Sequence, residues 1–152
     1  AQVIVTSRSE EKLQRAADLG ADHVLPSDDQ VARGVRRMTG KRGADVVVDS
    51  VGDATWMQSL KAAAKGGRIV TCGATSGANP AEEIRLIFWN QLSIIGSTMG
   101  SREDWRSLVA AVNAHQLKPV IDTVLPLAEG RAAYERMDQA EQFAKIVLSI
   151  DG

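Results

Sequence analysis

The stretch ADVVVDSVG at residues 44–52 decides the fold of this chain. Three valines between two aspartates, followed at once by small residues, predict a buried strand over residues 44–49 and a turn over 50–52. Before it, Asp28 or Asp29 can cap a helix that runs to Met38, and after it a helix is expected over residues 54–64, ended by Gly66 and Gly67. A buried strand between two helices is the unit from which parallel sheets are built.

The same alternation extends outward to both ends of the chain. Further strands are expected at residues 2–6 (QVIVT), 23–25, 68–72 (RIVTC), 92–98 (LSIIGST), 120–125 and 144–150, with a glycine-rich loop at 73–80. Further helices are expected from the N-cap residue Ser9 to Gly20, and at residues 81–90, 102–115 and 129–137. Because such apolar strands are covered by helices on both faces, we predict an α/β fold, a Rossmann-like doubly wound parallel sheet, in one domain over residues 1–152.

The composition excludes several classes of function. The 152 residues carry a formal net charge of −1, so no electrostatic attraction to nucleic acid or to an anionic membrane is expected. No run approaches the roughly 18 apolar residues of a membrane span. Cys72 is the only cysteine, which excludes an internal disulfide and a thiolate zinc cluster and favours a cytoplasmic protein. Cys72 is expected to pack inertly in its strand, and the two histidines lack metal-ligand spacing.

Sheets of this kind bind ligands beyond the carboxyl ends of their strands, so the residues that follow each strand are the candidate site. Small residues follow the strands at 44–49, 68–72 and 92–98, where they let a flat ligand approach the backbone closely. For each turn taken alone, the alternative interpretation is an ordinary glycine-containing loop with no ligand. Asp49, at the end of its strand, is expected to bond to nearby backbone. No side chain stands out as a catalytic acid, base or nucleophile.

Hydroxyl and cationic groups follow the first strand. In a dinucleotide-binding sheet an acid at this point bonds the ribose hydroxyls of NAD and repels the extra phosphate of NADP. Here Ser7 can donate to a phosphate oxygen, and Arg8 can hold a phosphate through its planar fork of donors, with Lys12 one helical turn further on. A helix cap beside an exposed arginine is the alternative. In the predicted fold, phosphate recognition is favoured.

Five stretches in this order resemble one known family. They are VIVTSRSEEKLQRAADLGADHVL, GADVVVDSVG, GGRIVTCGATSG, FWNQLSIIGSTMGSREDW and the tail VIDTVLPLAEGRAAYERMDQAEQFAKIVLSI. Together they resemble the cofactor-binding domain of the medium-chain dehydrogenase/reductase family, in its zinc-type alcohol dehydrogenase and quinone oxidoreductase branch. The resemblance implies an NADP(H)-dependent oxidoreductase that transfers hydride between the nicotinamide cofactor and an alcohol, carbonyl, quinone or enone substrate, with this chain as the cofactor-binding part.

The resemblance also implies roles for individual residues. Ser7, Arg8 and Lys12 would hold the adenosine 2'-phosphate. Ser50, Val51 and Gly52 would run alongside the adenine-ribose and pyrophosphate side of the cofactor. Gly73, Ala74 and Thr75 would meet the nicotinamide end, and Ser97, Thr98 and Met99 would flank the nicotinamide ring or its carboxamide. Lys145 would lie close to the cofactor, although Ala144 stands where the family usually has a glycine.

Two parts of the resembled fold have no counterpart in this sequence. One is the first strand with its G-x-G-x-x-G turn, which cradles the pyrophosphate, and the other is the GroES-like catalytic domain, which holds the substrate pocket and, in zinc members, the metal. In the strand order 3-2-1-4-5-6 the missing strand is central, and it leaves an open inner edge on each of its neighbours. We therefore expect an N-terminally truncated domain within a longer polypeptide, or a partner segment in the gap.

The remaining expectations concern partners and other function classes. The run from Leu92 to Thr98 should be an edge strand, and in this family such an edge often pairs across a two-fold axis in a homodimer; simple core burial is the alternative. A different class of function is a non-catalytic nucleotide-sensing or scaffold domain on a decayed Rossmann fold. An unrelated doubly wound domain, such as a methyltransferase, would carry an acid where Ser7 and Arg8 stand.

Overall fold

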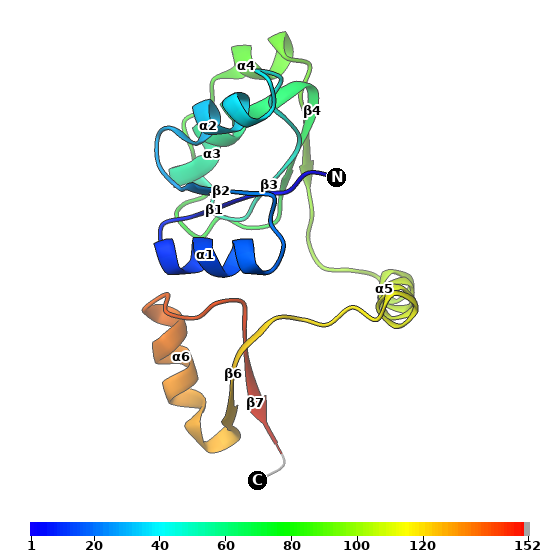
Figure 1. The fold of residues 1–152 in the computed structure, drawn as a ribbon. Coiled ribbons are helices and arrows are strands. Elements are labelled where there is room, and N and C mark those ends of the chain that lie inside the picture. Colours follow the sequence, from blue (N-terminus) through cyan, green and yellow to red (C-terminus); the bar gives the residue numbers. More distant parts are fainter. Residues whose placement is uncertain (151–152) are drawn as a thin grey trace. The chain divides into compact units, whose positions relative to one another are not determined.

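The computed structural model describes residues 1–150, and the chain divides into two compact units that are described separately, Ala1–Met99 and the residues from Gly100 onward. The first unit alternates strands and helices as predicted (Figure 1). Its elements are β1 (Ile4–Ser7), α1 (Glu10–Asp18), β2 (His23–Pro26), α2 (Val31–Met38), β3 (Ala44–Asp49), α3 (Asp53–Ala62), β4 (Ala63–Thr71), α4 (Ile84–Trp89) and β5 (Ser93–Gly96). The fold class is therefore the predicted α/β fold with parallel strands.

The strands of the first unit form two parallel sheets. In one sheet β1 pairs with β2, and in the other the order is β3-β4-β5. Among the described residues, β1 and β3 are not hydrogen-bonded to each other, and each has a strand neighbour on one side only. The sheet is thus interrupted between the two strands that the predicted order would place on either side of a further strand.

Helices α2 and α3 join the two sheets through one apolar cluster. Ala32 donates its backbone N–H to Oε1 of Gln58 at 3.1 Å, and Arg36 donates to the carbonyl oxygens of Lys61 and Ala63 at 2.9 and 3.3 Å. The cluster contains Leu25, Ala32, Val35 and Ala62, against which Ile4 and Ala44 pack. Because Ile4 and Ala44 are the first residues of β1 and β3, both strands start from the same cluster.

A second cluster fixes α3 and α4 on the β3-β4-β5 sheet. Its buried members are Trp56, Leu60, Ala63 and Ile69, with Val47, Leu86, Ile87 and Leu92 packed against them. Leu60 and Ile69 are fully buried, which stabilises the fold by about 1.5–3 kcal/mol for each side chain. This cluster lies directly beneath the start of α3, so it provides a rigid support for the loops at the ends of the strands.

Three expectations about the bounds and the burial of individual elements are wrong. Helix α3 ends at Ala62, not at Ala64, and Gly66 and Gly67 do not stop it, because Ala63 already pairs with Ala44 and the two glycines lie inside β4. Strand β3 is buried on one face only, since Val46 and Val48 are 44% and 71% exposed on the other. Cys72 is exposed, because β4 ends one residue before it.

Neither Asp28 nor Asp29 caps α2. The helix begins after Gln30, whose side chain makes no cap bond, and Asp28 instead accepts from the backbone N–H of Gln30 at 2.8 Å. Gln58 of α3 satisfies the donor in the first turn, so a local cap is not required.

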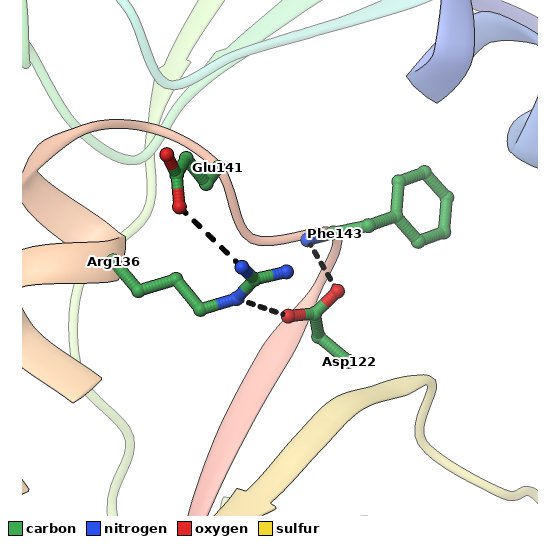
Figure 2. A network of polar contacts seen from close by, with 4 residues as sticks. All are labelled: Asp122, Arg136, Glu141 and Phe143. Atoms are coloured by element: carbon green, nitrogen blue, oxygen red, sulfur yellow. Dashed lines mark hydrogen bonds and ion pairs between the residues drawn. The ribbon is translucent and has the colours of Figure 1, made fainter. Parts of the chain in front are cut away.

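The second unit contains one parallel strand pair. Its elements are α5 (Arg102–His115), β6 (Ile121–Pro126), the 3-10 turn η1 (Leu127–Glu129), α6 (Gly130–Asp138) and β7 (Lys145–Ser149), with β6 paired to β7. Figure 2 shows how Asp122 of β6 ties these elements together: it accepts from Arg136 of α6 at 2.8 Å and from the backbone N–H of Phe143 at 3.1 Å. In residues 1–150 no helix is long and apolar enough to cross a membrane.

Candidate functional site

Two loops at the carboxyl ends of β3 and β4 lie side by side and continue the pairing of these strands. We call residues 50–53 and 73–77 the paired loops. The backbone N–H of Ser76 donates to the carbonyl oxygen of Val51 at 2.8 Å, and that of Asp53 donates to Gly77 at 3.0 Å. Gly52 and Gly77 form an isolated parallel bridge. Two predicted site segments, 50–52 and 73–75, are therefore held together in space.

The side chain of Ser76 joins the second loop to the first through hydrogen bonds. Its hydroxyl donates to the carbonyl oxygen of Val51 at 2.7 Å and accepts from the backbone N–H of Ala54 at 3.0 Å. No local sequence pattern distinguishes this residue from the other small residues of its loop. Only its partners, which lie 22 and 25 positions away, reveal its role.

Hydrogen bonds to the side chain of Asp49 hold the first loop in place. The carboxylate accepts from the backbone N–H groups of Val51 and Gly52 at 2.9 and 3.0 Å, from the Thr55 hydroxyl at 2.9 Å, and from the Ser59 hydroxyl at 2.6 Å. The expected bond to nearby backbone is confirmed. Burial raises the pKa of Asp49, but the hydrogen bonds from Ser59, Gly52, Val51 and Thr55 outweigh it, so the pKa lies below its ordinary value. The carboxylate is accordingly ionised at neutral pH.

Glycine is required at position 52, where the backbones of the paired loops are in direct contact. Gly52 has φ +86°, and a Cβ added to it would lie 2.4 Å from the carbonyl oxygen of Gly77. Gly73 is less crowded, since its Cβ would lie 3.1 Å from the carbonyl oxygen of Ser50, a tight contact that a shift of a few tenths of an ångström would relieve. These positions have small residues because of backbone contact within the protein, a requirement that is independent of any ligand.

The N-terminus of α3 has no donors to spare for an anion. Asp49 takes the N–H groups of Val51 and Gly52, Gly77 takes that of Asp53, and Ser76 takes that of Ala54. By contrast, the backbone N–H groups of Gly73 and Ala74 have no partner within the described residues, and both positions are exposed. The backbone N–H of the exposed Ser50 also has no partner among residues 1–150, so the donors that the paired loops offer to a ligand are those of Ser50, Gly73 and Ala74.

A cleft of about 450 Å³ adjoins the paired loops. Its lining includes Gly52, Gly73 and Ala74 from the predicted site, together with Thr71 and Trp56. Trp56 is 7% exposed, and its Nε1 is buried without a hydrogen-bond partner in the described part of the chain. The volume lies within the range of small-molecule sites.

The end of β1 presents a hydroxyl and a guanidinium. The hydroxyl oxygen of Ser7 accepts from the backbone N–H of Ser9 at 3.2 Å, which leaves its own proton for another acceptor. Ser9 caps α1 by accepting from the backbone N–H of Lys12 at 3.3 Å, as predicted. Arg8 is exposed and has no ion pair among residues 1–150. The three predicted phosphate-binding residues thus lie at the end of β1 (Ser7), just after it (Arg8) and in the first turn of α1 (Lys12).

The remaining predicted residues fall in two places. Ser97 lies beside the end of β4, since its backbone N–H donates to the carbonyl oxygen of Thr71 at 2.8 Å, and Thr98 and Met99 follow it in exposed positions. Lys145 starts β7 in the second unit, and its role stays a prediction. Ala144 before it has φ +72°, a left-handed conformation that costs a residue with a Cβ about 1–2 kcal/mol.

The described residues do not fit a metal centre. Among residues 1–150 no group of three or more His, Cys, Asp or Glu side chains could hold a metal ion. Zinc therefore has no ligands to be assigned here, and no chemical step is derived through it.

Parallel strands joined by helices, with glycine-containing loops at the strand ends, are typical of Rossmann-like α/β domains, which bind ligands at these ends. Residues 1–114 match the zinc-binding dehydrogenase family, and the chain belongs to that family. The family that the sequence motifs resembled is thereby confirmed.

The relatives are longer than this chain. A zinc-type alcohol dehydrogenase-like protein of Schizosaccharomyces pombe is 35% identical over 99% of this chain and 45% of its own length. The solved structure of an NAD-dependent alcohol dehydrogenase has a TM-score of 0.88 and 40% identity, covering 99% of this chain and 44% of its own. A mycobacterial protein solved in complex with NADPH has a TM-score of 0.78 and 28% identity, covering 97% and 49%. This chain spans less than half the length of each.

Proposed function

We propose that this chain is the nucleotide-binding part of an NADP(H)-dependent oxidoreductase that acts on an alcohol, carbonyl, quinone or enone substrate. The observation that carries the choice of cofactor is the turn after β1, where Ser7 and the exposed guanidinium of Arg8 stand in place of an acid. The substrate domain and the pyrophosphate-binding turn would come from a longer polypeptide, in keeping with the greater length of the relatives and with the open edges of β1 and β3.

The residues present fit the two ends of such a cofactor. Ser7, Arg8 and Lys12 would hold the adenosine 2'-phosphate. The N–H groups of Gly73 and Ala74 would donate to the nicotinamide end, with Thr75, Ser97, Thr98 and Met99 around them. Ser50, Val51 and Gly52 would offer the cofactor close contact with carbon and carbonyl atoms, because the N–H groups of Val51 and Gly52 are taken by Asp49. When bound, the nicotinamide supplies or accepts the hydride.

The relatives support both cofactors. One close structural relative is named as NAD-dependent, and a more distant one was solved with NADPH. An NAD site of this fold uses a carboxylate on the ribose hydroxyls, whereas a 2'-phosphate is held by an arginine nearby. The turn after β1 offers the second chemistry, so we propose NADP(H).

Replacing Arg8 by Ala should separate the two cofactors. In the complete protein, the R8A variant should bind NADPH about 10- to 100-fold more weakly, because one or two charge-assisted hydrogen bonds are lost, while NADH affinity stays the same. Fluorescence titration of both cofactors at low ionic strength measures this. The matched control is R37A, which removes an exposed arginine of α2 away from the strand ends.

Three results would contradict the proposal. Equal losses for both cofactors would place Arg8 outside the 2'-phosphate site. Tighter binding of NADH than of NADPH by the unchanged protein would reverse the cofactor preference. Absence of binding for both by the complete protein would favour the non-catalytic nucleotide-sensing or scaffold function.

We also propose that β5 forms a homodimer by pairing with its copy. It bonds to β4 on one side, and its other side has no described strand, while Ile94 and Ile95 are partly exposed. Sedimentation equilibrium should give a dimer at micromolar concentration. The variant I95K should be monomeric, because a lysine on an edge strand opposes strand pairing. A monomeric unchanged protein would contradict the proposal.

A further inference from the structure

Asp49 lies between the proposed cofactor surface and the protein core. It is only 4% exposed, yet each of its carboxylate oxygens is hydrogen-bonded. Two of its donors are backbone N–H groups of the first loop, and two are hydroxyls of α3, from Thr55 and Ser59. One carboxylate thus fixes the first loop to the first two turns of α3, which the second apolar cluster supports through Trp56 and Leu60.

The second loop takes its position from the first. It is held by the bonds of Ser76 to Val51 and Ala54 and by the bond from Asp53 to Gly77. Because the free N–H groups of Gly73 and Ala74 belong to this second loop, their position depends on the path of residues 50–53, and that path depends on Asp49.

The same carboxylate also limits where a phosphate can lie. An open helix N-terminus attracts anions through its free N–H groups and its dipole. At α3 those N–H groups are already bonded, and a buried anion stands beside them. A cofactor phosphate therefore has no favourable place at this helix N-terminus.

We infer that Asp49 is a positioning residue, which sets the paired loops for the nicotinamide half of the cofactor without touching the cofactor itself. This inference rests on the proposed function. The 2'-phosphate contacts do not depend on Asp49, because Ser7 ends β1 and Arg8 follows it, in the sheet that does not contain β3.

Binding of the whole cofactor and of half of it distinguishes positioning from general stabilisation. In the complete protein, D49N should weaken NADPH binding by about tenfold, as small misplacements of binding groups do. Binding of adenosine 2',5'-bisphosphate, which lacks the nicotinamide half and whose 2'-phosphate would be held by Ser7 and Arg8, should weaken much less than that of NADPH. Calorimetric titration measures both. The matched control is D45N on the same strand, where the exposed Asp45 pairs with Arg42 away from the loops; it should change neither affinity.

Each alternative outcome has a definite meaning. If D49N weakens both probes equally, or leaves NADPH unchanged while the unchanged protein binds both, the inference is wrong and the proposed function stands. If the unchanged protein binds neither probe, the proposed function is wrong and the inference with it.

A second variant keeps the test decisive if D49N does not fold. S76A removes these side-chain hydrogen bonds between the loops at an exposed position, so its effect on folding should be small. It should weaken NADPH binding several-fold and binding of the bisphosphate much less. Unchanged NADPH affinity in a folded S76A protein would overturn the inference.

Discussion

The variant G52A should lower the free energy of unfolding by about 3–5 kcal/mol and abolish tight cofactor binding. Two physical terms add up at this position. A residue with a Cβ is strained by about 1–3 kcal/mol in the glycine conformation of Gly52, which has φ +86° and ψ −123°. Its Cβ would also lie 2.4 Å from the carbonyl oxygen of Gly77, so the paired loops must separate. Urea denaturation and NADPH titration measure the two effects.

The matched control is G66A. Gly66 also has a positive φ, +73°, but a Cβ there would meet nothing within 4 Å. It should therefore show only the conformational cost, about 1–2 kcal/mol, and keep cofactor affinity. Equal destabilisation by the two variants would mean that the contact between the paired loops contributes nothing to stability.

The sequence predicts an element well where its signals are local. Strand β3 and helix α5 have the predicted bounds, Ala44–Asp49 and Arg102–His115, because a valine run and a Ser101–Asp104 capping box each lie within a few residues. The start of β4 was missed because it depends on pairing between Ala44 and Ala63. That pairing draws the end of a helical sequence into an extended strand, which no local pattern indicates.

In the candidate site, too, residues with local sequence signals were predicted, and residues whose roles depend on distant partners were not. The strand-end rule selects Gly52 and Gly73, and the structure brings both to the paired loops. It cannot find Ser76 or Ser59, whose roles depend on partners in other elements. Nor does it show that Val51 and Gly52 donate their N–H groups to Asp49, so that neither N–H is available to a ligand.

The variant D122A should lower the free energy of unfolding by about 3 kcal/mol or more through the second unit. The Asp122 side chain is 2% exposed, and it bonds both to Arg136 of α6 and to the backbone N–H of Phe143 just before β7 (Figure 2). Removing one partner of a buried ion pair costs about 3–5 kcal/mol. In D122A the part-buried N–H of Phe143 loses this acceptor, while Arg136 keeps its 3.4 Å ion pair with Glu141. The side chain of Arg136 is 37% exposed and can regain water, which places the expected loss at the lower end of that range.

The matched controls isolate the two bonds of Asp122. D122N keeps an oxygen for the N–H of Phe143 but loses the charge, so its loss should be smaller than that of D122A. E135A breaks the exposed pair between Glu135 and Arg131 on the same helix and should change stability by about 0.5 kcal/mol at most. Urea denaturation of all three gives the comparison. A loss in D122A as small as that in E135A would show that the ion pair does not hold α6 and β7 onto β6.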